Sequence, residues 1–280
     1  MVFSSTLRGA LLLGAVTLSV FALSACGGDS AGNSKLAEKA IEQQNLGKLS
    51  AAGAMNAYAD ALKQNDVRHL VELVSTKAAL DEMKTQFAKM KTEPVSAEER
   101  RQFTESFGRL TAPDAVDSIM KEIEPKLVEY KNQLPGIIAM GAGALQMQVA
   151  GSSVSEDEKS SATKAISAMQ TWAGKTDFAD PKRARNAITA LVDAAQSIGL
   201  KTPEDVKALS FEQALDKVGV CLGGFKKALN AYDFDLDAIL GSIKVTDLAK
   251  PGEVQIKATL FGTELTGKGN LTQREGRWTQ

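Results

Sequence analysis

Cysteine and histidine are nearly absent from this chain of 280 residues, which has two cysteines, one histidine and only 5% aromatic residues. The lone His69 excludes a metal cluster that needs several imidazoles. Cys26 and Cys221 are far apart in the sequence, so the chain has no CxxC redox motif. We therefore expect neither a metal site nor a cofactor.

The chain also lacks an excess of charge of either sign. Lys and Arg number 33 against 34 Asp and Glu, a formal net charge of −1, so nothing favours nucleic acid as a partner. No stretch after Cys26 is apolar and uncharged for long enough to span a bilayer. Hydrophobic residues make up 44% of the chain, which is enough to bury a core without disulfide bonds.

An export signal is present at the N-terminus. Arg8 precedes an uncharged, mostly apolar run over residues 9–22, an order typical of signal peptides. The next four residues, Leu23-Ser24-Ala25-Cys26, resemble the lipobox of bacterial lipoproteins. The resemblance implies that residues 1–25 are removed and that Cys26 carries several acyl chains, which give a stable membrane anchor. An ordinary signal peptide with a nearby cysteine is the alternative.

The residue after this cysteine bears on the choice of membrane. In Gram-negative lipoproteins an Asp at that position favours the inner membrane, whereas this chain has Gly27. The resemblance therefore implies an anchor in the outer membrane that faces the periplasm. Residues 26–34 are mostly small and polar, so we expect a flexible tether between the lipid and the folded body.

Helical periodicity dominates residues 35–240, where apolar residues recur every three or four positions. Capping boxes and Asx-Pro or Thr-Pro pairs mark where helices begin, and Gly199 is the expected stop of one of them. The expected capping residues at helix starts are Ser96, Thr111, Ser155, Asp180, Thr202 and Ser210.

Prolines and an apolar run mark the middle of this helical region. Pro125 is expected to kink or break a helix, and Pro135-Gly136 to end it. Residues 137–150 are apolar almost all round, a pattern typical of a central helix buried among its neighbours.

Period-two alternation replaces the helical pattern over residues 241–280, with turn residues at 250–253 and 274–277. The fold class predicted is α+β: a mostly helical body with a small C-terminal antiparallel β-meander packed on it. The last strand begins at Trp278 and is expected to be cut short, with an open edge for another molecule.

The two ends of the mature chain also resemble those of NTF2-like periplasmic domains. The segment from Tyr58 to Asp66, followed by a second helix, and the terminal meander closing on Gly276-Arg277-Trp278 carry this resemblance. It implies a curved sheet wrapped on a few helices. The long helical segment between the two ends departs from that pattern.

Few side chains are candidates for a catalytic or ligand-binding role. Cys221 lies on an apolar helix face, where we expect a buried and inert thiol; a redox or crosslinking role is the alternative. His69 has the chemistry of a general base, but its helix position favours a partly exposed structural role. The pairs Gly141 with Gly143 and Gly223 with Gly224 lack the Lys of a phosphate loop, so we expect close helix packing instead.

An alternating acidic motif, Asp233, Asp235 and Asp237, resembles the start of a calcium loop. Ala238 and Lys244 stand where that loop needs Gly and a bidentate Glu. The motif therefore favours a helix cap or a solvated turn.

Because no catalytic constellation is present, the expected function is a non-catalytic binding or interaction module in the periplasm. Its partner would be an unidentified envelope protein, and an inhibitor or immunity role is one form of this hypothesis. The alternative is an unfamiliar enzyme using Asp233 or Asp235, or a carrier of small apolar ligands, in a crevice between helices and sheet. Met140, Met147 and Met169 are possible lining residues of such a carrier.

Overall fold

The computed structural model describes residues 49–279. The predicted signal peptide, the predicted lipidation site Cys26 and the predicted tether therefore lie outside the described residues. Helices of this part of the chain are, in order, α3 (Ala51–Gln64), α4 (Val67–Val74), α5 (Lys77–Thr92), α6 (Ala97–Phe103), α7 (Arg109–Thr111), α8 (Ala115–Ala150), α9 (Glu156–Lys175), α10 (Pro181–Ile198), α11 (Pro203–Ala208), α12 (Phe211–Asn230) and α13 (Leu236–Ser242).

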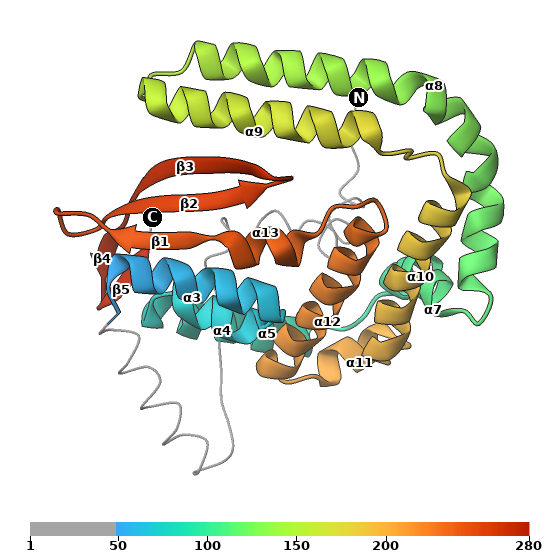
Figure 1. Cartoon of the computed structure of the whole chain (residues 1–280). Helices are drawn as coiled ribbons and strands as arrows, with labels where there is room; N and C mark the ends of the chain where they lie inside the picture. The colour runs from blue at the N-terminus through green and yellow to red at the C-terminus, as the bar shows by residue number, and fades with distance from the viewer. Residues whose placement is uncertain (1–48, 280) are drawn as a thin grey trace, which may run out of the picture.

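The strands follow the helices in the chain. A π-helical turn (Thr104–Gly108) joins α6 to α7. The strands are β1 (Lys244–Asp247), β2 (Glu253–Leu260), β3 (Thr263–Asn270), β4 (Thr272–Arg274) and β5 (Arg277–Thr279). The α+β class with a mostly helical body and a small C-terminal antiparallel sheet is confirmed (Figure 1).

The capping signals begin helices where the sequence predicted, except at Thr111, which is the last residue of α7, while α8 begins at Ala115 after Asp114. At the start of α9 the Ser155 hydroxyl accepts from the Glu158 N–H, while the Glu158 carboxylate accepts from the Ser155 N–H. The same reciprocal bonds occur at Ser96, Thr202 and Ser210, and Asp180 caps α10 with Pro181 in its first turn. α10 ends at Gly199, whose φ of 73° is a left-handed conformation that glycine adopts without steric cost.

The expectation that Pro135-Gly136 ends a helix is wrong. α8 continues through Pro125 and Pro135, and Figure 1 shows it bending along its length. A proline inside a helix removes one backbone hydrogen bond and kinks the axis, but contacts on both sides of the kink can hold the helix together. Here α10 packs against α8 and α9 runs back along it, so both halves have neighbours.

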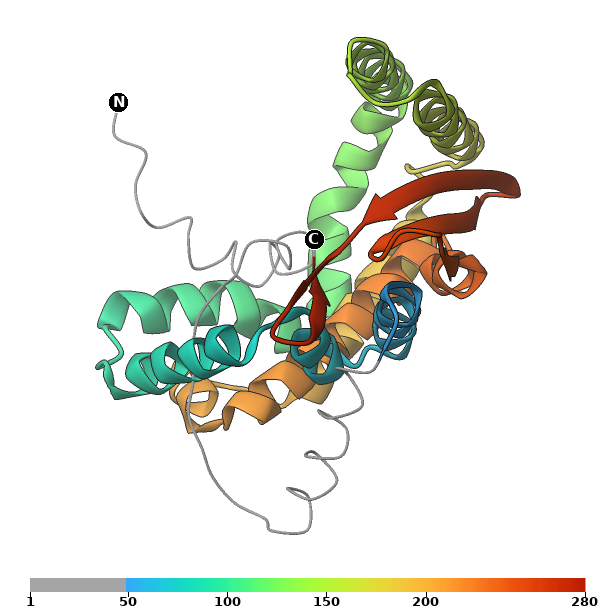
Figure 2. The same cartoon turned by 90° about the vertical axis from the view of Figure 1, so that its left-hand side faces the viewer.

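α8 and α9 form a helical hairpin, and α8 also packs against α10. Figure 2 shows α8 rising from the helical body before the chain folds back as α9 beside the sheet. On the other side of the sheet, α3 packs on β1 and β2, where Ala51, Ala52, Val245 and Val254 share a buried core cluster. The hairpin and α3 thus flank the sheet.

Helix side chains occupy both edges of the three-stranded sheet, whose order is β1-β2-β3. At the β1 edge the Asn56 amide of α3 donates to the Val245 carbonyl and accepts from its N–H, both at 3.2 Å. At the β3 edge the Thr266 N–H donates to the Ser161 hydroxyl of α9 at 3.1 Å. Such side chains block the pairing of another strand at these positions.

β4 and β5 form a separate two-stranded hairpin, as the turn at 274–277 predicted, although they do not extend the three-stranded sheet. Trp278 of β5 donates from Nε1 to the Leu49 carbonyl at 2.8 Å, and its own carbonyl accepts from the Tyr58 hydroxyl at 2.7 Å. The Arg277 guanidinium donates to the carbonyls of Glu72 and Ser75 at the end of α4. The last strand is therefore held by α3 and α4, the first helices described.

An aromatic cluster fixes the α8–α9 hairpin to the rest of the molecule. The Trp172 ring of α9 stacks on Phe261 in the β2–β3 turn, with centroids 5.3 Å apart and an interplanar angle of 2°. Phe234 and Phe178 meet the same indole edge to face at 5.0 and 5.4 Å. The Trp172 Nε1 donates to the Tyr232 carbonyl at 2.9 Å, which satisfies the polar end of the indole.

Candidate functional site

Cys221 makes apolar contacts on α12. It packs against the cluster of Phe107, Ala195 and Ile198, and burial raises the pKa of its thiol. Because the thiolate is the nucleophile, a raised pKa leaves little reactive form near neutral pH. The prediction of an inert thiol on an apolar face agrees with this geometry.

The three alternating aspartates have three separate structural partners. Asp233 forms an ion pair with Arg183 of α10 at 2.7 Å, and Asp235 caps α13 by accepting from the Ala238 N–H at 2.8 Å. Asp237 forms an ion pair with Lys226 at 2.6 Å. Across residues 49–279 no group of three or more His, Cys, Asp or Glu is placed to hold a metal ion. The cap and turn interpretation of this motif is confirmed.

The two glycine pairs differ in their surroundings. A Cβ on Gly224 would lie 2.4 Å from the Ala194 Cβ and one on Gly223 would lie 3.3 Å from the Asn65 Nδ2, so this pair permits close packing of α12. A Cβ on Gly141 or Gly143 would meet nothing within 4 Å. The expectation of close packing is confirmed for α12 and is wrong for α8.

His69 is partly exposed on α4, and its backbone N–H donates to the Asp66 carboxylate that caps this helix. The placement fits the structural role expected of it. The acidic groups 98–99 and 156–158 lie in the first turns of α6 and α9, where carboxylates oppose the positive end of the helix dipole.

The predicted burial of residues 137–150 is wrong. This segment of α8 instead forms an exposed apolar surface. Ile137, Met140 and Met147 are 52%, 71% and 73% exposed. Together with the exposed Ala144 they repeat at intervals of three, four and three residues, so they lie on one face of α8 that points away from α9. We call these four residues the α8 stripe.

The α8 stripe lies in a segment without charge. No charged residue occurs between Lys131 and Glu156, a segment that also contains the exposed Leu145 and Val154. Despite this composition, no helix among residues 49–279 is long and apolar enough to cross a membrane. Met140 and Met147 therefore belong to an outer face of α8, not to a crevice between helices and sheet.

Carboxylates lie in the first turn of α9, at the tip of the hairpin where α8 is followed by α9. Glu156, Asp157 and Glu158 begin α9 directly after the uncharged segment, and the Glu156 side chain is 88% exposed. Lys159 pairs with Glu156 at 2.9 Å. The Ser155 hydroxyl donates to Glu158 and holds the pKa of that carboxyl below its usual range. The first turn of α9 therefore carries net negative charge.

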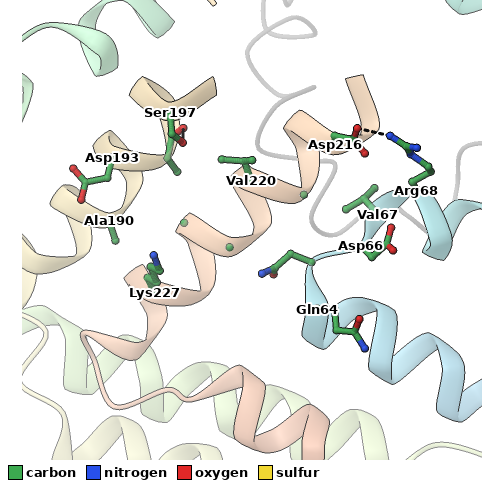
Figure 3. A pocket seen from close by; sticks show the side chains of 15 residues that line it. Gln64, Asp66, Val67, Arg68, Ala190, Asp193, Ser197, Asp216, Val220 and Lys227 are labelled. Carbon is green, nitrogen blue, oxygen red and sulfur yellow. Dashed lines mark hydrogen bonds and ion pairs between the residues drawn. The ribbon is translucent and has the colours of Figure 1, made fainter. Parts of the chain in front are cut away.

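A pocket of about 810 Å³ lies elsewhere, over α12 (Figure 3). Its walls come from the α3–α4 turn and from α10. The residues of α12 that line it are Asp216, Gly219, Val220, Gly223, Gly224 and Lys227.

The glycines of α12 let both walls of this pocket approach the helix closely. A Cβ on Gly219 would lie 2.3 Å from the Asn65 carbonyl oxygen, and Gly224 faces α10 in the same way. Sequence analysis identified the glycine pair of α12 but not the pocket, because α10 and the α3–α4 turn reach α12 only through the tertiary fold.

The side chains around the pocket carry charge of both signs. Arg68 pairs with Asp216 at one end, whereas Figure 3 places Asp193 and Lys227 on the α10 side, away from that pair. Two polar atoms of lining residues, Asn65 Oδ1 and Arg68 Nε, are buried without a hydrogen-bond partner in the described chain. An unsatisfied buried polar atom costs about 1–3 kcal/mol, so native proteins contain few of them.

Comparisons with protein-family models, with curated proteins and with solved structures found no match to this chain.

Proposed function

We propose that this chain is an envelope lipoprotein, anchored through lipid on Cys26 to the periplasmic face of the outer membrane, and that it binds another protein without catalysing a reaction. The exposed α8 stripe is the observation that carries the binding part of this proposal. The sequence Leu23-Ser24-Ala25-Cys26 supports the anchor.

The free energy of apolar burial favours a partner at the α8 stripe. Covering a Met, Leu or Ile side chain is worth about 1.5–3 kcal/mol each. Contiguous exposed apolar surface on a soluble protein commonly marks an interaction site. Methionine adds adaptability, since its unbranched side chain fits apolar surfaces of different shape.

Negative charge at the hairpin tip favours a protein partner over a lipid surface. Glu156, Asp157 and Glu158 would oppose insertion into an anionic lipid surface. They complement a protein whose apolar groove has a basic rim, because opposite charges steer such surfaces together. The partner proposed is therefore an envelope protein with a groove of that character.

A photocrosslinking amino acid placed at Met147 in living cells tests the docking. We expect a reproducible adduct with one envelope protein, and no such adduct from the exposed Lys182 of α10. The purified partner should then bind the wild-type chain and lose at least about tenfold in affinity with Met140→Lys, because a charge would be buried against an apolar groove.

Val128→Lys is the matched control for Met140→Lys. Val128 and Met140 are both 71% exposed on α8, but Val128 lies outside the uncharged segment and off the stripe. Equal loss of binding in both variants, adducts with lipid or with a second copy of the chain, or no reproducible adduct would contradict the proposal.

Intact mass and membrane fractionation test the anchor separately. The native protein should carry acyl mass and sediment with the outer membrane, and Cys26→Ala should lose the acyl mass and leave that membrane. An unlipidated native protein would overturn the anchor without bearing on the α8 stripe.

A further inference from the structure

We propose that the pocket between α10, α12 and the α3–α4 turn binds short peptides that have free termini and small side chains. This site is separate from the α8 stripe, so the two proposals stand or fall independently. Its volume of about 810 Å³ lies within the range of roughly 300–1,000 Å³ that is typical of small-molecule pockets.

The charges around the pocket favour a ligand that carries one charge of each sign. The ion pair between Arg68 and Asp216 neutralises two of the lining groups. Asp193 and Lys227 are exposed, and neither side chain has an ion pair or hydrogen bond within residues 49–279. A polyanion would meet the Asp193 carboxylate, and a polycation would meet the Lys227 ammonium. A zwitterion offers each group an opposite charge.

The unsatisfied polar atoms favour a ligand with both a donor and an acceptor. Asn65 Oδ1 is an acceptor and Arg68 Nε–H is a donor, and a peptide unit supplies the complement of each. Because both atoms are buried, binding requires these side chains to turn toward the pocket. Asn65 Oδ1 has no hydrogen bond to lose in that movement, whereas turning Arg68 would disturb the ion pair of its guanidinium with Asp216.

The floor of the pocket favours small side chains. Gly219 and Gly223 are covered by Asn65 of the α3–α4 turn, and beside them Val220 contributes a shallow apolar surface that is 38% exposed. These residues provide no large apolar recess for an aromatic or long aliphatic side chain.

Isothermal titration of the full chain with trialanine tests the proposal. We expect saturable binding of trialanine, and binding at least about tenfold weaker for N-acetyl-trialanine amide, which lacks both terminal charges. Lys227→Met and Asp193→Asn should each weaken trialanine binding by about tenfold for the same reason. Val220→Trp should abolish binding, since an indole would occupy the space above α12.

Lys182→Met and Asp60→Asn are the controls, because both residues are exposed and neither lines the pocket. These variants should bind trialanine as the parent chain does. Absence of saturable binding, equal affinity for the blocked peptide, or binding that Lys227→Met and Val220→Trp leave unchanged would overturn the proposal. Binding of chitotriose or inorganic phosphate in place of trialanine would overturn it as well.

Discussion

Lys226 carries a charge into the interior of the molecule, where its side chain is only 4% exposed. Its ammonium donates to the carbonyls of Leu62 and Lys63, at the C-terminal end of α3, and pairs with Asp237 at the start of α13. Three donors of one ammonium thus join α12 to two other helices. A cation at the end of α3 also complements the negative end of its helix dipole.

The variant Lys226→Met should lower the free energy of unfolding by about 2 kcal/mol, because it leaves the two carbonyls without their charged donor. Urea denaturation measures the loss. Lys227→Met is the matched control, since the neighbouring side chain is exposed and has no partner in the described region. Equal effects of both substitutions would contradict this role of Lys226.

The Cys221 thiol should lower the free energy of unfolding only at alkaline pH. Its folded pKa lies above the unfolded value because burial disfavours the thiolate. As the pH rises past the unfolded pKa, the unfolded chain loses the proton while the folded chain keeps it, so the free energy of unfolding falls.

Urea titrations across neutral and alkaline pH, on the parent chain and on Cys221→Ala, isolate this contribution. The alkaline decline should be shallower in Cys221→Ala, whatever the cost of the small cavity. Iodoacetamide should also modify Cys221 slowly in buffer and rapidly in urea. Rapid modification of the folded chain would show that the thiol is accessible.

At the scale of elements, α10 and α12 cross closely because Gly224 of α12 has no side chain. A Cβ on Gly224 would lie 2.4 Å from the Ala194 Cβ and 3.0 Å from the Ala190 carbonyl oxygen. Both obstacles belong to the small residues and backbone of α10, which cannot move aside without moving the helix. Close packing of helices commonly uses such positions.

Gly224→Ala should therefore destabilise the chain by about 1–3 kcal/mol through overpacking. Gly143→Ala in α8 should instead stabilise it by about 0.5–1 kcal/mol, because alanine favours helix and nothing lies within 4 Å of the new Cβ. Thermal unfolding of the two variants separates the effects by sign. Stabilisation by both would mean that α10 does not pack closely on α12.

At the scale of the whole molecule, the chain closes on itself where β5 meets α3 and α4. Arg277 donates to the carbonyls of Glu72 and Ser75, and Tyr58 donates to the Trp278 carbonyl. These bonds join residues about 200 positions apart, since Arg277 and Glu72 differ by 205. Contacts of this length cost chain entropy that local helices do not.

Arg277→Ala should lower the free energy of unfolding by about 1.5–3 kcal/mol, the range for hydrogen bonds that involve a charged donor. Arg274→Ala is the control: this exposed arginine of β4 has no side-chain partner within the described residues. Differential scanning calorimetry compares the unfolding midpoints of the two variants. Similar midpoints would contradict a stabilising role for the hydrogen bonds of Arg277.

The sequence alone determined the local features of this protein. Capping residues and period changes located helices and strands because they act within three or four residues of the backbone groups that they satisfy. The same local chemistry assigned Asp235 to a helix cap and excluded a calcium loop at the alternating aspartates.

Only the tertiary structure decided which surfaces are covered. Residues 137–150 have the composition of a buried helix, yet α8 presents Met140 and Met147 to solvent because α9 and α10 contact other faces. The pocket over α12 and the Trp172 cluster likewise join segments distant in sequence. A local sequence pattern shows which face of a helix is apolar. Whether that face is buried depends on a second segment, distant in the sequence, that packs against it.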